Sequence, residues 1–266
     1  MLFVNHDIHV HTMLSACVED AAAIPTNYIQ QAATLGLKTI GFADHVWDRN
    51  MPGASPWYQP QDMEHILSIR DQLPNDTLGI KVLIGCESEY WGDGRIGISR
   101  AAAEQLDFVL LPMSHAHMTS FAVPGVVTSL ADLSQLLVKR FHEVIDLRIA
   151  TGIAHPFFPI GYIEHVDEII AGISDTQFID CFGRAAEAGV SIEIQPSYFP
   201  SLHGKPQEGF HDETFFRVLS LAKRCGCYFH FGSDAHSLAA LNSLTVLDQV
   251  IEQIGINRDD IPPWLR

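Results

Sequence analysis

Short apolar runs typical of buried strands alternate with helix-like stretches along the whole sequence. We expect strands at residues 4–11, 39–44, 80–89, 108–114, 152–155, 190–195 and 228–232. We expect helices at 25–35, 61–72, 98–105, 130–149, 176–188, 213–225 and 241–254. Gly36, Gly189 and Gly226 each follow a predicted helix end, where a left-handed residue commonly ends a helix. The alternation predicts an α/β fold with a parallel sheet, and about seven strand–helix units predict a closed or slightly distorted (β/α)7 TIM-like barrel.

The composition limits the partners of such a barrel. The 266 residues, read as a single domain over 1–266, carry a net charge of −16, which makes nucleic acid a poor bulk partner. No apolar run approaches the roughly 20 residues of a spanning helix, and the first motif begins too early for a cleavable signal peptide, so we expect a cytoplasmic protein. Five scattered cysteines without a Cys-x-x-Cys pair indicate neither a disulfide framework nor a structural zinc site.

Every predicted strand ends in carboxylate or imidazole side chains. They are His9, His11, Asp44, His45, Glu87, Glu89, His115, His117, His155, Glu193, Asp234 and His236, and the amide side chain of Gln195 accompanies Glu193. Pairs two residues apart project from one face of a strand, and the carboxyl ends of barrel strands converge. Imidazole with carboxylate suits zinc, manganese or iron. A catalytic zinc usually takes three protein ligands, so this set predicts two or three divalent metal ions.

Each histidine also has an ordinary structural interpretation, because a lone imidazole at a strand end commonly makes a hydrogen bond. Recurrence at all the strand ends favours the metal interpretation. Away from them, His65, His142 and His165 are predicted to be solvated. Structural roles are favoured for the remaining histidines, which are His6, His203, His211 and His230. His117 is expected to support His115 rather than bind metal itself.

Seven segments resemble, in order, motifs of the polymerase and histidinol phosphatase (PHP) superfamily, most of all its histidinol-phosphatase branch. They are Asp7-Ile8-His9-Val10-His11-Thr12, Ala43-Asp44-His45, Gly85-Cys86-Glu87-Ser88-Glu89-Tyr90, Ser114-His115, Ala154-His155-Pro156, Ile192-Glu193-Ile194 and Gly232-Ser233-Asp234-Ala235-His236. Any one segment is weak evidence, whereas the ordered set is specific. The resemblance implies a distorted seven-stranded β/α barrel that binds up to three divalent metals.

The resemblance also implies a role for each residue. One metal would be bound by His9, His11, Glu87 and Asp234, and a second by Glu87, His115 and His155. A third would be bound by His45, His236 and the residue at position 17, where the family has histidine and this chain has Cys17. Cysteine thiolate is a good zinc ligand, so this site either survives with an altered metal preference or is lost. Catalysis would depend on Glu87 and Asp234, with Asp7, Asp44 and Glu193 orienting the ligands.

The segment after the sixth predicted strand departs from the histidinol-phosphatase pattern. That branch resembles Glu-x-Asn-Thr-Ser-Gly-Leu-Arg, with an arginine that helps to hold phosphate, whereas residues 193–198 here contain none. Lys205, later in the loop, can substitute as a point charge or can be an ordinary solvated lysine. Arg95 is a weaker candidate. Both are predicted to bind substrate.

These features predict metal-dependent hydrolysis of a small phosphorylated metabolite, with L-histidinol phosphate as the first candidate substrate. A PHP-type nuclease or editing domain would need a basic track or stacking aromatics, and the only aromatic cluster is Trp47, Trp57 and Tyr58. The sequence also leaves two alternative functions open, a phosphotyrosine phosphatase and a non-catalytic metal-binding module. The sequence does not determine the oligomeric state.

Overall fold

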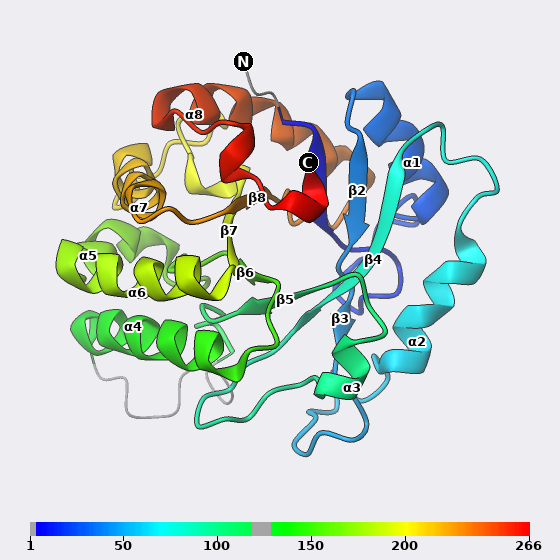
Figure 1. Ribbon diagram of the computed structural model, residues 1–266, viewed down its shortest axis with the longest axis horizontal. Helices are drawn as coiled ribbons and strands as arrows, with labels where there is room; N and C mark the ends of the chain where they lie inside the picture. The colour runs from blue at the N-terminus through cyan, green and yellow to red at the C-terminus, as the bar shows by residue number, and fades with distance from the viewer. Residues whose placement is uncertain (1–3, 119–128) are drawn as a thin grey trace.

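A parallel sheet forms the centre of the computed structural model, which describes residues 4–118 and 129–266 (Figure 1). The strands follow one another in the order β1 (His6–Val10), β2 (Thr39–Phe42), β4 (Lys81–Ser88), β5 (Phe108–Pro112), β6 (Gly152–Ala154), β7 (Ser191–Ile194) and β8 (Phe229–Phe231). The short strand β3 (His45–Val46) pairs with β4 as well. The prediction of a seven-stranded, barrel-like α/β domain is confirmed.

The last strand returns beside the first and nearly closes the barrel. The His11 amide donates to the Ala235 carbonyl at 3.0 Å, and the Asp234 amide donates to the His9 carbonyl at 2.8 Å. At the start of β1, Nε2 of the buried His6 accepts a hydrogen bond from the Phe231 amide at 3.1 Å, which gives His6 a structural role. Segments more than 220 residues apart in sequence therefore lie side by side.

Helices flank the barrel. They are α1 (Pro25–Thr34), α2 (Met63–Leu67), α3 (Arg100–Ala103), α4 (Leu130–Leu147), α5 (Val166–Ala171), α6 (Asp175–Ala188), α7 (Asp212–Arg224) and α8 (Leu247–Ile254). Helix α6 lies between α4 and α7 on one side of the sheet (Figure 1). The three glycines predicted at helix ends have φ angles between 70° and 78°. No described helix is long and apolar enough to cross a bilayer.

Some predicted element boundaries are wrong. The predicted helix over 61–72 begins at Met63, because Asp62 accepts the His65 amide as its N-cap, and it ends in a 3₁₀ helix over Ser68–Gln72. The predicted helix over 241–254 is a 3₁₀ helix until Val246 and becomes α8 only afterwards. The six-residue α5 was missed, because a single short turn carries little periodicity. The strands also end earlier than expected, so most ligand residues lie just beyond the paired sheet.

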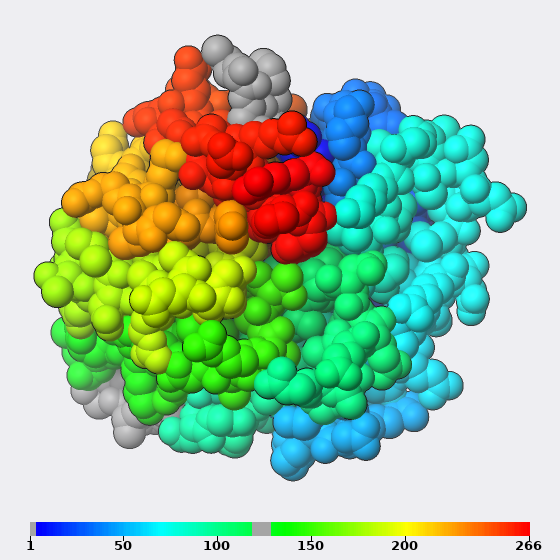
Figure 2. All heavy atoms as spheres, in the orientation of Figure 1, coloured from blue at the N-terminus to red at the C-terminus, as the bar shows by residue number. Residues whose placement is uncertain are grey.

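Apolar side chains close the amino-terminal end of the barrel. The ring of Phe108 lies so close to Gly85 that a Cβ there would be 2.4 Å from it, and a Cβ on Gly41 would be 2.9 Å away. Trp264 stacks on Phe108 with ring centroids 6.2 Å apart, and its carbonyl accepts a hydrogen bond from Lys81. Figure 2 shows the C-terminal residues covering this face. Because apolar side chains fill this end, the predicted ligand residues lie at the opposite end, where the strands have their carboxyl ends.

Candidate metal centre

The first predicted ligand group is assembled by the closure of β1 against β8. The Nε2 atoms of His9 and His11 lie 3.1 Å apart. They lie 3.5 and 3.3 Å from Asp234 Oδ1, and each lies 3.5 Å from Glu87 Oε2. Ligands of a tetrahedral zinc with bonds of about 2.0–2.2 Å are separated by about 3.3–3.6 Å. The four side chains therefore fit a single ion.

The second predicted group shares Glu87. Its Oε1 atom lies 2.8 Å from His155 Nε2 and 3.8 Å from His115 Nε2. Its Oε2 atom faces the first group and also lies 3.3 Å from His45 Nδ1. The two carboxylate oxygens thus point to different sets of imidazoles, which is the arrangement of a bridging ligand.

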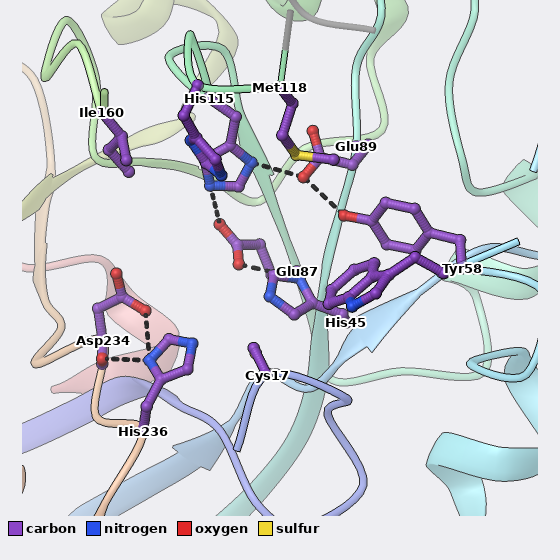
Figure 3. Close-up of a pocket in the computed structure, with 12 residues that line it drawn as sticks. Cys17, His45, Tyr58, Glu87, Glu89, His115, Met118, Ile160, Asp234 and His236 are labelled. Carbon is purple, nitrogen blue, oxygen red and sulfur yellow. Dashed lines mark hydrogen bonds and ion pairs between the residues drawn. The ribbon is translucent and has the colours of Figure 1, made fainter. Parts of the chain in front are cut away.

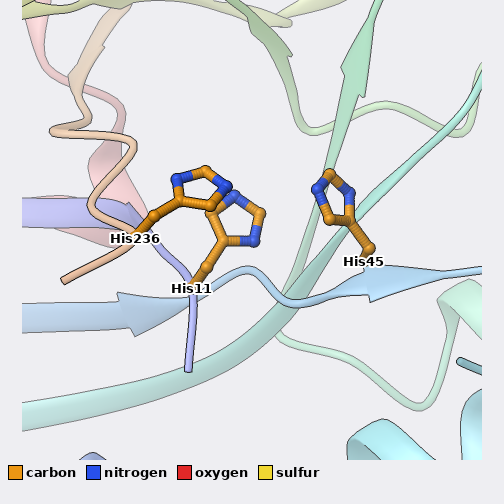
Figure 4. Close-up of side chains that lie close together, drawn as sticks. All are labelled: His11, His45 and His236. Carbon is orange, nitrogen blue, oxygen red and sulfur yellow. The ribbon is translucent and has the colours of Figure 1, made fainter. Parts of the chain in front are cut away.

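A third group consists of His11, His45 and His236, whose ligand atoms lie within 4.8 Å of one another (Figure 4). Figure 3 shows the Cys17 side chain entering the same cavity beside His45 and His236. Burial, together with the Glu87 and Asp234 charges, raises the pKa of Cys17 to about 12. Without a cation this sulfur is therefore a thiol. His11 belongs to this group as well as to the first, which the sequence did not predict.

Carboxylates orient two of the ligand rings directly. His9 Nδ1 donates to Glu193 Oε1, and His115 Nδ1 donates to Glu89 Oε1, both at 2.6 Å. Because Nδ1 carries the proton in each case, the Nε2 lone pair faces the cavity. The predicted orienting role of Glu193 matches this contact.

Hydroxyl and carbonyl groups orient three more rings in the same sense. The Ser114 hydroxyl donates to the His155 carbonyl, so it accepts from His155 Nδ1 at 2.8 Å. The Ser15 hydroxyl donates to Asp44 and accepts from His11 Nδ1 at 3.1 Å. His236 Nδ1 donates to the Asp234 carbonyl at 2.9 Å. The Nε2 lone pairs of all five rings are thus left free for a ligand.

The donor set fits divalent cations. Imidazole lone pairs and carboxylate oxygens face one another at 2.8–3.8 Å, and a cation between them turns this repulsion into coordination. The buried His45 Nδ1 has no hydrogen-bond partner. Buried polar atoms usually have one, so this nitrogen is a candidate metal ligand. Desolvation alone would raise the pKa of Glu87, but the surrounding imidazoles of His9, His45 and His155 hold it well below its usual range. Glu87 is therefore ionised, and its two oxygens are available to bind two different metal ions.

Two residues adopt strained backbone conformations here. His155 has φ 30° and Asp234 has φ 54°, although neither is glycine. The His155 amide donates to Glu193 Oε2 at 2.5 Å, and the Asp234 amide bonds to β1, which stabilises these conformations. A Cβ on Gly232 would lie 2.1 Å from Glu193 Oε1, so glycine is what allows Glu193 to reach His9.

The two predicted orienting aspartates act differently from each other. Asp44 reaches His11 through Ser15, as described above. Asp7 contacts no ligand ring; it accepts the amides of His9 at 3.0 Å and Ser233 at 3.1 Å and so joins β1 to the segment after β8. Burial raises the pKa of Asp7 to about 7 in spite of these hydrogen bonds.

Three other predicted residues lie farther from the ligands. His117 is exposed on the cavity wall and contacts the His115 ring edge-on, with centroids 5.4 Å apart. Lys205 and Arg95 are exposed and are not among the residues that line the cavity. Among the histidines predicted to be solvated, His65 is half-buried, and its Nε2 bonds to the Leu14 carbonyl at 2.8 Å. That prediction was wrong for His65 and for His142, which is half-buried and bonds to Arg184 at 2.8 Å.

Sequence reasoning missed a hydrogen-bonded chain of supporting residues. Glu89, which accepts from His115, also accepts the hydroxyl of the buried Tyr58 on the same oxygen at 2.7 Å. The signal for Glu89 was its position two residues after Glu87, which directs both side chains to the same face at the end of β4. Tyr58 lies in an irregular loop, so no periodicity pointed to it.

A cavity of about 470 Å³ opens above the ligand groups (Figure 3). It is lined by Cys17, His45, Trp57, Tyr58, Glu87, Glu89, His115, His117, Met118, Ile160, Asp234 and His236. Within the described ranges, 4–118 and 129–266, the lining contains no lysine or arginine. A cavity of this size suits a small molecule.

The comparisons with known proteins agree with this geometry. A model of the PHP domain matches residues 7–197, and the chain therefore belongs to the PHP domain family. A relative named a probable phosphatase, from Aliivibrio fischeri strain MJ11, is 27% identical over 97% of this chain and 88% of its own length. Another of the same name, from Clostridium botulinum strain Hall, is 23% identical over 94% of this chain and 86% of its own length.

Solved structures show the same fold. The histidinol phosphate phosphatase of Lactococcus lactis, in complex with zinc, L-histidinol and phosphate, superposes with a TM-score of 0.61 at 16% identity, covering 95% of this chain and 94% of its own. A structure described under metal-dependent tyrosine phosphatases of Bacillus subtilis and Streptococcus pneumoniae gives a TM-score of 0.52 at 17% identity, covering 96% and 89%. At these identities the likeness concerns the fold.

Proposed function

We propose that this chain is a metal-dependent phosphatase that hydrolyses a small phosphate monoester, with L-histidinol phosphate as the first candidate substrate. The observation that carries the proposal is Glu87, whose two oxygens face separate imidazole groups beneath a cavity of small-molecule size. Relatives named as phosphatases and a neighbour bound to L-histidinol and phosphate support the reaction class.

Two or three divalent ions (zinc, manganese or iron), held by the ligand groups described above, would supply positive potential for the phosphate oxygens and a water of lowered pKa. The chain's own residues prepare that site. Glu87 and Asp234 contribute ionised oxygens, and Glu193, Glu89 and Asp44 hold the imidazoles in the tautomer that presents Nε2. With no lysine or arginine in the described lining, phosphate charge is left to the metals.

Cys17 is proposed as a ligand of the third ion, together with His45 and His236. The test is cobalt substitution, because cobalt bound to a thiolate absorbs in the near ultraviolet by sulfur-to-metal charge transfer. Cys17→Ser is expected to remove this absorption and to lower the cobalt stoichiometry, while Cys225→Ser leaves both unchanged. An identical spectrum in Cys17→Ser would assign the third group to histidines alone.

The enzymatic test is phosphate release from L-histidinol phosphate by metal-free protein, with and without added Mn²⁺ or Zn²⁺. We expect release only with metal and its loss in Glu87→Gln. Metal binding without turnover on this or any other phosphate ester would instead support a non-catalytic metal-binding module. Efficient competition by a phosphotyrosine peptide would favour a tyrosine phosphatase. The absence of basic side chains in the described lining argues against a nuclease or editing domain.

A further inference from the structure

The cavity lining combines two chemical classes of side chain. Imidazoles and carboxylates form the predicted ligand groups, and Trp57, Met118 and Ile160 contribute apolar surface. The Trp57 indole is 38% exposed although its ring centroid lies only 5.2 Å from that of His45. A phosphate bound at the predicted ligand groups would therefore place its ester substituent near an open indole ring.

The segment that carries Trp57 is held in place from behind. Gln61 Nε2 donates to the Trp57 carbonyl at 2.8 Å. The neighbouring Tyr58 is fully buried, bonds to Glu89, and contacts the indole edge-on with centroids 4.6 Å apart. The exposed indole is thus presented on a supported backbone, which is what a preorganised stacking platform requires.

The charges of the lining argue against a second anion on the substrate. Glu89 uses only Oε1 for its hydrogen bonds to His115 and Tyr58. The described lining offers no lysine or arginine as a partner for a second anion. An additional carboxylate or phosphate on the leaving group would lose hydration against apolar side chains without gaining a partner.

We propose that the site selects monoesters whose leaving group carries a flat ring and no second anionic group, with Trp57 as the specificity-determining residue. This inference rests on the proposed phosphatase function and names its substrate class. Stacking of a planar ring on the indole supplies the preference for flat groups, and apolar side chains without a basic partner disfavour a second anion.

The experiment compares esters whose leaving alcohols have similar reactivity: benzyl, cyclohexylmethyl, butyl and 4-carboxybenzyl phosphate. With metal-loaded protein, benzyl phosphate is expected to show a kcat/KM about three- to tenfold above cyclohexylmethyl phosphate, the range that aromatic stacking gives. The carboxybenzyl ester is expected to fall below benzyl phosphate. Trp57→Phe retains the preference, whereas Trp57→Ala and Trp57→Leu lose it.

The matched control is Ile179→Ala, which removes another exposed apolar side chain, 43% exposed on α6. It is expected to keep the wild-type pattern. Metal content is measured in every variant, because Trp57 contacts His45. Affinity for benzylphosphonate, which cannot be hydrolysed, supplies a readout independent of turnover and should weaken in Trp57→Ala.

Two results would overturn this inference alone: equal kcat/KM for benzyl and cyclohexylmethyl phosphate, or unchanged selectivity and benzylphosphonate affinity in Trp57→Ala. Equal turnover of the carboxybenzyl ester would overturn the exclusion of anions. If no ester is hydrolysed while benzylphosphonate binds through Trp57, the phosphatase proposal fails and the binding preference stands. If none is hydrolysed and benzylphosphonate does not bind, both fail.

Discussion

Gly232 is the position where one added methyl group should disable the metal centre. An alanine Cβ there would lie 2.1 Å from Glu193 Oε1 and 2.7 Å from the Cβ of His9, both too short for non-bonded atoms. Glu193 would have to leave its place. It would then lose its hydrogen bonds to His9 Nδ1 (2.6 Å), to the His155 amide (2.5 Å) and to Gln195 Nε2 (2.9 Å).

The expected magnitudes follow from those contacts. Loss of the carboxylate that orients a ligand histidine typically weakens metal affinity about 10- to 100-fold. A buried amide left without a partner costs about 1–3 kcal/mol, so the free energy of unfolding of the metal-free protein should fall by at least that amount. Glu193→Gln, which keeps the shape and removes the charge, should weaken metal binding with a smaller loss of stability.

The assays are zinc titration against a competing chelator and urea unfolding of the metal-free protein. Gly183→Ala is the matched control, because a Cβ at this position in α6 meets nothing within 4 Å. It should stabilise the protein by about 0.5–1 kcal/mol, as expected for alanine in place of glycine in a helix. Wild-type metal affinity and stability in Gly232→Ala would refute the role assigned to Glu193.

Two further predictions concern buried side chains. Burial lowers the pKa of His6 from 6.5 to about 3, so the unfolded chain takes up a proton that the folded protein excludes. Stability should therefore fall as the pH drops below 6.5, by up to about 1.4 kcal/mol per pH unit, and urea unfolding of His6→Gln between pH 7 and 5 should show a smaller slope than wild type. An unchanged slope would contradict this. Tyr58→Phe removes one of two hydrogen bonds to Glu89 Oε1 and should cost about 0.5–1.5 kcal/mol of stability, with weaker metal binding than wild type; identical metal titration curves would remove Tyr58 from the support of His115.

The sequence predicted which residues gather at the candidate metal centre because their positions follow from two regular properties. Side chains two residues apart share a strand face, as His9 and His11 do, and parallel strands of a barrel end on one side. The predicted strands were displaced by a few residues at most. This error matters little, because the predicted ligand residues lie either near the carboxyl ends of their strands, as His9 and Glu87 do, or shortly beyond them.

The supporting residues were harder to predict because they depend on irregular backbone. Tyr58 comes from a loop without a repeating pattern, and its contact with Glu89 spans 31 residues. The role of Asp7 depends on how β1 meets the segment after β8, which no local pattern encodes. Lys205 was selected for charge alone, and proximity in sequence to the sixth predicted strand did not bring it into the cavity lining.

The geometry of the closure links metal binding to the integrity of the barrel. The hydrogen bonds from the His11 and Asp234 amides join β1 to the segment after β8, and both residues are also candidate ligands of the first group. An ion held between these two residues should oppose local separation of β1 from the segment after β8. A ligand stabilises the state that binds it by about 4 kcal/mol when its free concentration is 1,000 times its Kd. Hydrogen exchange of these two amides should slow on metal addition more than that of Ile192, whose amide bonds to the Tyr228 carbonyl at the far end of the strands. Equal slowing at all three amides would mean that the metal stabilises the whole domain at once. Unchanged exchange of the His11 and Asp234 amides would mean that metal binding does not stabilise the closure of the barrel.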